Sequence, residues 1–120
     1  MSYSISYEKK HDYLYVHMSG PESLKSAEKF WEDLAEKSAA ENHEKFLIID
    51  EVDGRLSTTE LHALSLKVAQ LFRGKKIAYI DPKTETFDDN RFGENVVYNR
   101  GVNAKVFRSA DEGVNWLIKV

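Results

Sequence analysis

The stretch KFLIIDEVDGRLSTTELHALSLKVAQLFRG, residues 45–74, decides the fold of this chain because it joins an apolar run to a well-marked helix. Residues 46–49, FLII, are apolar without alternation, which is typical of a strand covered on both faces, as in a parallel sheet. The β-branched pair Ile48 and Ile49 favours a strand over a helix. We therefore predict a buried strand here that leads into an acidic loop.

A helix start follows that loop. Ser57 and Glu60 have the spacing of a capping box, in which each side chain accepts a hydrogen bond from the other residue's backbone amide. Apolar residues then recur at helical spacing and predict one buried stripe, made of Leu61, Leu64, Val68 and Leu71, with Leu66 and Phe72 beside it. Gly74 suits the left-handed position that ends a helix. A strand followed by a helix is the first half of a βαβ unit.

The beginning of the chain has a different period. Residues 3–8 and residues 13–18 alternate polar with apolar or aromatic side chains around a short polar link. This pattern predicts an antiparallel hairpin, most simply at an edge of the sheet. Leu14, Val16 and Met18 are its expected inward-facing residues.

The remaining segments continue the alternation of helices and strands. After Pro21 a helix is expected, with an apolar face made of Leu24, Ala27, Trp31, Leu34 and Ser38. Short apolar runs at residues 77–80 and 104–107 predict two more strands, each followed by a helix, the first capped by Thr86 and the second by Ser109. We therefore predict one α/β domain, residues 1–120, in which about four helices pack on a mixed sheet of about five strands. The sheet would hold an antiparallel hairpin followed by parallel strand–helix units.

Composition narrows the classes of function. The 120 residues fit one hydrophobic core, and the absence of cysteine excludes disulfides and thiolate chemistry. A net charge of −3 without a basic stripe argues against nucleic-acid binding. No apolar run approaches the roughly 20 residues of a transmembrane helix, and the N-terminus lacks the apolar core of a signal peptide. We expect a soluble, cytoplasmic protein.

The motifs of catalysis and cofactor binding are missing from the sequence. Asp50, Glu51 and Asp53 could suggest a divalent cation, but the spacing of a calcium-binding loop is absent, so we expect no metal. No phosphate-binding loop, nucleophile elbow or i, i+4 histidine pair occurs. We therefore expect neither a cofactor nor an enzymatic activity. The polar loops at the carboxyl ends of the strands are either a surface for a partner or the ordinary loops of such a fold.

Aromatic residues are the other feature that needs an explanation. Most are expected in the core, but Trp31, Phe92 and Trp116 could also line an apolar pocket between the sheet and the helices.

Several stretches resemble the STAS superfamily, the fold of bacterial anti-sigma-factor antagonists, and more narrowly the small stand-alone bacterial STAS/SEC14-like proteins. The likeness lies in FLIIDEV, in LSTTELHALS and in FGENVVYNRGVNAKVFRSADEGVNWL, and it covers nearly the whole chain. The antagonists carry an Asp-Ser-x-Gly pattern at the start of this helix, where a partner kinase phosphorylates the serine. On this sequence Ser57 stands for the aspartate, Thr58 for the phospho-acceptor and Glu60 for the glycine.

The resemblance implies two functions. The first is a non-catalytic regulatory module that binds a protein partner, with a partner-binding or phospho-acceptor-like surface made of Asp50, Asp53, Ser57, Thr58 and Thr59. The second, implied by the SEC14-like proteins, is a carrier of a small apolar ligand or lipid. A homodimer formed through the edge hairpin is a further alternative.

Overall fold

Five strands form one mixed sheet in the computed structural model, which describes residues 3–119. The strands are β1 (Ser4–Lys9), β2 (Leu14–Pro21), β3 (Lys45–Asp53), β4 (Lys76–Ile80) and β5 (Asn103–Phe107). They lie side by side in chain order, β1 antiparallel to β2 and each later neighbouring pair parallel. The predicted hairpin at the edge and the predicted parallel units are confirmed.

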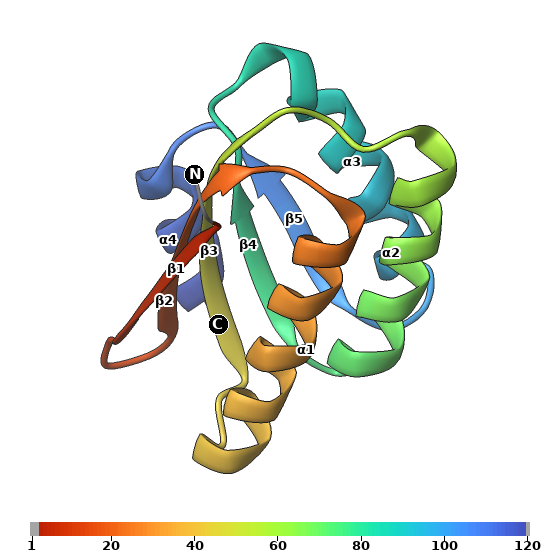
Figure 1. Cartoon of the computed structure of the whole chain (residues 1–120). Helices are drawn as coiled ribbons and strands as arrows, with labels where there is room; N and C mark the ends of the chain where they lie inside the picture. The colour runs from red at the N-terminus through yellow and green to blue at the C-terminus, as the bar shows by residue number, and fades with distance from the viewer. Residues whose placement is uncertain (1–2, 120) are drawn as a thin grey trace.

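The helices that connect the strands lie mostly on one face of this sheet (Figure 1). They are α1 (Leu24–Glu41), α2 (Thr58–Phe72), α3 (Thr84–Tyr98) and α4 (Ala110–Ile118). Because β2 to β5 are added in one direction, three right-handed crossovers place α1, α2 and α3 on the same side. Among the helices of residues 3–119, only α4, which follows the last strand, packs on the other side, against β3, β4 and β5. No helix within residues 3–119 has the length and hydrophobicity needed to cross a bilayer.

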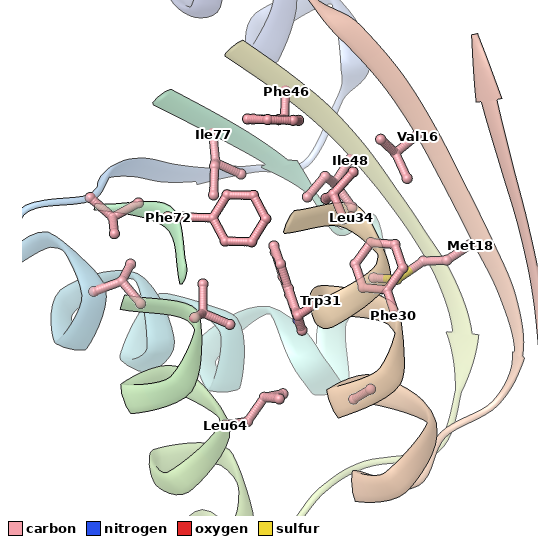
Figure 2. Packing of buried hydrophobic residues seen from close by; sticks show 14 of the residues in the cluster. Val16, Met18, Phe30, Trp31, Leu34, Phe46, Ile48, Leu64, Phe72 and Ile77 are labelled. Carbon is pink, nitrogen blue, oxygen red and sulfur yellow. The ribbon is translucent and has the colours of Figure 1, made fainter. Parts of the chain in front are cut away.

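The larger core lies between the sheet, α1 and α2 (Figure 2). Trp31 of α1 and Phe72 of α2 point into the same space, with their rings edge to face and their centroids 5.4 Å apart. The inward side of the hairpin joins this core, because Leu14, Val16 and Met18 are buried as predicted. A smaller core forms where Leu117 of α4 packs on the other face of the sheet.

The central stretch has the predicted local structure. Phe46, Leu47 and Ile48 are at most 1% exposed, as a strand covered on both faces requires. Both bonds of the capping box are present: Glu60 N donates to Ser57 Oγ at 3.1 Å, and Ser57 N donates to Glu60 Oε1 at 2.9 Å.

The buried stripe of α2 and the start of α3 differ from the prediction. Leu71 is 38% exposed, because the buried stripe of α2 runs through Leu64, Val68 and Phe72 at strict four-residue intervals. The third helix begins at Thr84, and Thr86, the predicted cap, lies buried inside it.

Candidate functional site

The polar side chains of interest meet at one edge of the sheet because β2, β3 and β4 run in parallel. Pro21 is paired with Asp53 and Ile49 with Ile80, so Glu22, Asp50 and Asp81 all lie near the carboxyl ends of adjacent strands. In open parallel sheets this edge is where ligands bind.

Asp50 is the centre of the cluster and is only 5% exposed. Its carboxylate accepts hydrogen bonds from Val52 N at 2.9 Å, Tyr79 Oη at 2.8 Å and Lys83 Nζ at 3.2 Å. Burial, reinforced by the negative charge of Asp50, raises the pKa of Tyr79 well above its ordinary value. Tyr79 is therefore held as a neutral donor to this carboxylate.

Asp81 forms a second buried acceptor beside Asp50 and is fully inaccessible to solvent. Its Oδ1 accepts a hydrogen bond from Lys83 N and forms an ion pair with Lys83 Nζ, both at 3.0 Å. Its Oδ2 accepts from Thr86 Oγ1 at 2.7 Å and from Asn90 Nδ2 at 2.6 Å. Burial alone would lower the pKa of Lys83, but the carboxylates of Asp50 and Asp81 outweigh it and raise that pKa. Lys83 is thus a fixed cation that joins β3 to the start of α3.

Glu22 stands at the junction of β2 and α1, next to the loop that follows β3. Its backbone N donates to Asp53 O at 2.7 Å. Burial, together with the charge of Asp50, raises the pKa of the Glu22 side chain to about 7; Lys83 opposes this shift and Glu60 adds to it. Glu22 therefore titrates near neutral pH.

This shift predicts a pH-dependent stability. Because the pKa of Glu22 is higher in the folded state than its ordinary value of 4.5, the folded chain holds this proton more tightly than the unfolded chain. The stability that Glu22 contributes is complete below that ordinary value and is lost as the pH rises through about 7. We expect the Glu22→Gln variant to gain about 1–2 kcal/mol of unfolding free energy relative to wild type between about pH 5 and pH 8, after a discount for partial exposure.

Denaturant melts at several pH values measure this difference. Glu36→Gln, at an exposed position of α1, is the matched control and should track wild type. Parallel curves for Glu22→Gln and wild type would contradict the prediction.

The loop between β3 and α2 is exposed but held at several points. Arg55 donates to both carboxylate oxygens of Asp89 on α3, each at 2.9 Å. Gly54 has a φ of 100°, which a residue with a side chain rarely adopts. Together with the capping box and the bond from Glu22 N to Asp53 O, these contacts fix the loop against the β2–α1 connection, α2 and α3.

The predicted surface residues divide into two groups. Asp53, Ser57, Thr58 and Thr59 are exposed; Asp53 ends β3, Ser57 caps α2, and Thr58 and Thr59 form the first turn of that helix. Asp50, expected on the same surface, is buried, since its side chain points from β3 into the hydrogen-bonded cluster beneath the loop. We call Asp53, Arg55, Ser57, Thr58 and Thr59 the cap surface.

Two neighbouring cavities lie between the sheet and the helices. The first, the polar pocket, has a volume of about 50 Å³ and is lined by Tyr3, Glu22, Trp31, Asp50, Tyr79 and Lys83, among others. The second, the apolar cavity, has a volume of about 80 Å³ and lies among α2, α3, β4 and β5, with Val68, Ile77, Val97 and Val106 in its wall. Trp31, Leu64 and Tyr79 line both, so the two cavities are adjacent.

The three aromatic residues expected to form one pocket are not brought together. Trp31 lines both cavities, but Phe92 is 39% exposed on α3. The inward face of α3 passes instead through Thr86, Asn90, Gly93 and Val97. Three of these four residues are polar or small, so a search for apolar residues at helical spacing does not find this face. Trp116 lies on the opposite face of the sheet.

Sequence reasoning missed Glu22, Tyr3 and Tyr79 as members of the site. The signal for Glu22 was present, since a second hairpin strand that pairs in parallel with β3 places the residue after it at the carboxyl edge. Tyr79 carried no such signal, because a tyrosine in a short apolar run is more often core. Within residues 3–119, no group of three or more His, Asp and Glu side chains is arranged to hold a metal ion.

Among solved structures, the chain is similar to an uncharacterised protein from the DUF3478 family with a SpoIIAA-like fold from Shewanella loihica PV-4. The likeness has a TM-score of 0.58 at 22% sequence identity and covers 96% of this chain and 93% of that one. No protein-family model matches the sequence, and no curated protein matches it either. The mixed sheet of residues 3–119, its helices and this similarity lead to one conclusion about architecture: the chain has the SpoIIAA-like, and hence STAS-like, α/β fold.

Proposed function

We propose that this chain is a non-catalytic regulatory module that binds a protein partner through the cap surface. The observation that carries the proposal is the combination of exposure and rigidity in the loop between β3 and α2. Asp53 and Thr58, at the two ends of this loop, are exposed. Glu22 N, between β2 and α1, nevertheless holds Asp53, and the Arg55–Asp89 pair ties the loop to α3. A surface that is already ordered loses little conformational entropy on binding, which favours affinity.

The charge of this surface indicates what kind of partner fits. Arg55 is neutralised by Asp89, whereas Asp53 and Glu60 have no ion pair within residues 3–119, and Glu85 and Asp88 add negative charge nearby on α3. A partner with basic side chains would be complementary to this end of the molecule.

Thr58 is the residue of the cap surface best placed for modification. It is exposed in the first turn of α2, where the helix dipole favours an added phosphate. The negative charge of Glu60, two residues on and already bonded in the capping box, opposes that phosphate. Added negative charge would strengthen binding to a basic partner. Phosphorylation of Thr58 would therefore weaken that binding only if the phosphate disturbs the capping box.

The SEC14-like alternative, a lipid carrier, is less well supported. The two cavities of about 50 and 80 Å³ are far smaller than the pockets of roughly 300–1,000 Å³ that hold larger ligands. These two cavities have no room for a lipid chain, so they favour only a small ligand. A third hollow, of about 300 Å³, lies between the turn that joins β1 to β2 and the end of α1, but charged and polar side chains make up most of its lining, which does not suit a lipid chain.

Charge reversal at the cap surface tests the proposal. We expect Asp53→Lys to weaken capture of a partner from a lysate by about tenfold or more, because it places like charges face to face. Asn115→Lys, at an exposed position of α4 on the opposite face, introduces the same side chain with half the change in net charge and should retain the partner. Capture is measured by quantitative mass spectrometry, and unfolding midpoints verify that each variant is folded.

A partner is counted only if wild type and Asn115→Lys enrich it equally. If such a protein binds Asp53→Lys as well as it binds wild type, the cap surface is not the contact. Thr58→Glu provides a second, independent alteration of the same surface.

A further inference from the structure

The polar pocket has the composition of a site for an organic cation. The aromatic rings of Tyr3, Trp31 and Tyr79 all line it, and the rings of Trp31 and Tyr79 are stacked with centroids 6.3 Å apart. The face of an aromatic ring attracts ammonium groups, and several rings around one small space are the usual way in which proteins bind alkylammonium ions.

The charges around the pocket favour a cation as well. Three carboxylates line it, from Glu22, Asp50 and Asp89, against the two cationic groups of Arg55 and Lys83. Arg55 is held by Asp89, and Lys83 is shared between Asp50 and Asp81, which lies outside the lining. Within residues 3–119, Glu22 is thus the lining carboxylate that forms no ion pair.

Glu22 also has unused capacity to accept hydrogen bonds. Within residues 3–119, the one donor to its carboxylate is Ser23 N, at 3.2 Å. A carboxylate that is partly removed from water and poorly hydrogen-bonded gains more from an ammonium donor than an exposed one does.

The apolar cavity behind the pocket defines the rest of the ligand. It shares residues such as Trp31, Leu64 and Tyr79 with the polar pocket. Six aliphatic side chains lie in its wall, Leu61, Leu64, Val68, Ile77, Val97 and Val106, beside a few polar ones such as Glu94 and Lys105. An apolar cavity of about 150 Å³ binds benzene, so the 80 Å³ here suits a branched aliphatic group of a few carbons rather than a ring.

We propose that the two cavities together bind a small aliphatic amine, with the ammonium group in the polar pocket against Glu22 and the branched hydrocarbon in the apolar cavity. Binding of the amine does not require the protein partner proposed for the cap surface. Arg55 and Leu56, from the loop between β3 and α2, nevertheless form part of the pocket wall.

A matched series of probes separates charge from shape. 3-Methylbutylamine carries both head and tail, 3-methylbutan-1-ol has the same tail with a neutral head, and 4-methylpentanoate has an anionic head. We expect saturable chemical-shift changes with the amine at neutral pH, with an affinity about tenfold or more above that of the alcohol, and no binding of the acid. The shifts should centre on Trp31 and Tyr79.

Two variants test where the ammonium group and the hydrocarbon group of the amine bind. Glu22→Gln should reduce the affinity for the amine by about fivefold or more and leave that for the alcohol unchanged. Ala104→Leu, which extends a side chain of β5 into the apolar cavity, should weaken both probes alike. Well-dispersed spectra verify that the variants are folded.

Several outcomes would overturn the proposal: equal affinity for the amine and the alcohol, no saturable change with the amine, or an unchanged amine affinity in Glu22→Gln. None of these results bears on whether Asp53→Lys loses a protein partner, so the two proposals stand or fall separately.

Discussion

Replacement of Asp81 by alanine is expected to lower the free energy of unfolding by about 3–5 kcal/mol, because it removes one partner from a buried, charged network. Asp81 is completely buried and accepts hydrogen bonds from Lys83, Thr86 and Asn90. Without it, the hydroxyl of Thr86 and the amide of Asn90 lose their acceptor, and Lys83 keeps only Asp50 as a counter-charge. Urea denaturation, with the slope of the transition verified as unchanged, measures the loss.

Two further variants show whether the network or the mere presence of a carboxylate matters. Asp81→Asn keeps the shape and one acceptor oxygen but turns the other oxygen into a donor that faces the donors of Thr86 and Asn90, so we expect about half of the loss. Asp88→Ala removes an exposed carboxylate from α3, the helix that follows Asp81, and should change stability by no more than about 0.5 kcal/mol. A loss below about 1 kcal/mol for Asp81→Ala would contradict the role given to this network.

The fold could be predicted from the sequence wherever the local signals agreed with the packing. The run from Phe46 to Ile49 is long enough and apolar enough to be a covered strand, and Ser57 with Glu60 marks the following helix start without ambiguity. From these two signals and the alternation of the remaining segments, the element order and the parallel connections followed. A fold can be predicted from sequence where secondary-structure propensity, hydrophobic pattern and helix caps all indicate the same elements.

The site was less predictable because its residues do not follow the patterns that mark elements. The start of α3 is fixed by Asp81, which lies three residues before the first helical residue and reaches forward to Lys83 and Thr86, so a search for an ordinary cap chose Thr86 instead. Asn90 faces inward although asparagine usually indicates an exposed position. Hydrogen bonds between buried polar residues that are distant in sequence can be predicted only when the arrangement of the strands that bring these residues together is known.

The same reasoning applies to the lone glycine in α4, which a sequence pattern would class as a defect in the helix. We expect Gly113→Ala to destabilise the protein by about 2–3 kcal/mol, although alanine is favoured over glycine in a helix by about 1 kcal/mol. A methyl group at this position would lie 2.4 Å from Ile80 Cδ1 and 3.2 Å from Leu47 Cδ1. Gly113 thus allows α4, the only helix within residues 3–119 on that face, to approach the sheet closely. Thermal or urea unfolding measures the effect, with the exposed Asn115→Ala on the same helix as control.

A double-mutant cycle tests the stated cause. Ile80→Val removes the methyl group nearest to residue 113, and alone it should cost about 0.5–1.5 kcal/mol, because it leaves a small void beside the glycine. Combined with Gly113→Ala, it makes room for the new methyl group, so the double variant should be more stable than the sum of the two losses by about 1 kcal/mol or more. Strict additivity would mean that the alanine is not excluded by Ile80 and that helix α4 is held at its distance from the sheet by something else. A stabilised Gly113→Ala would show in addition that the helix shifts freely on the sheet, as only a loosely packed second core allows.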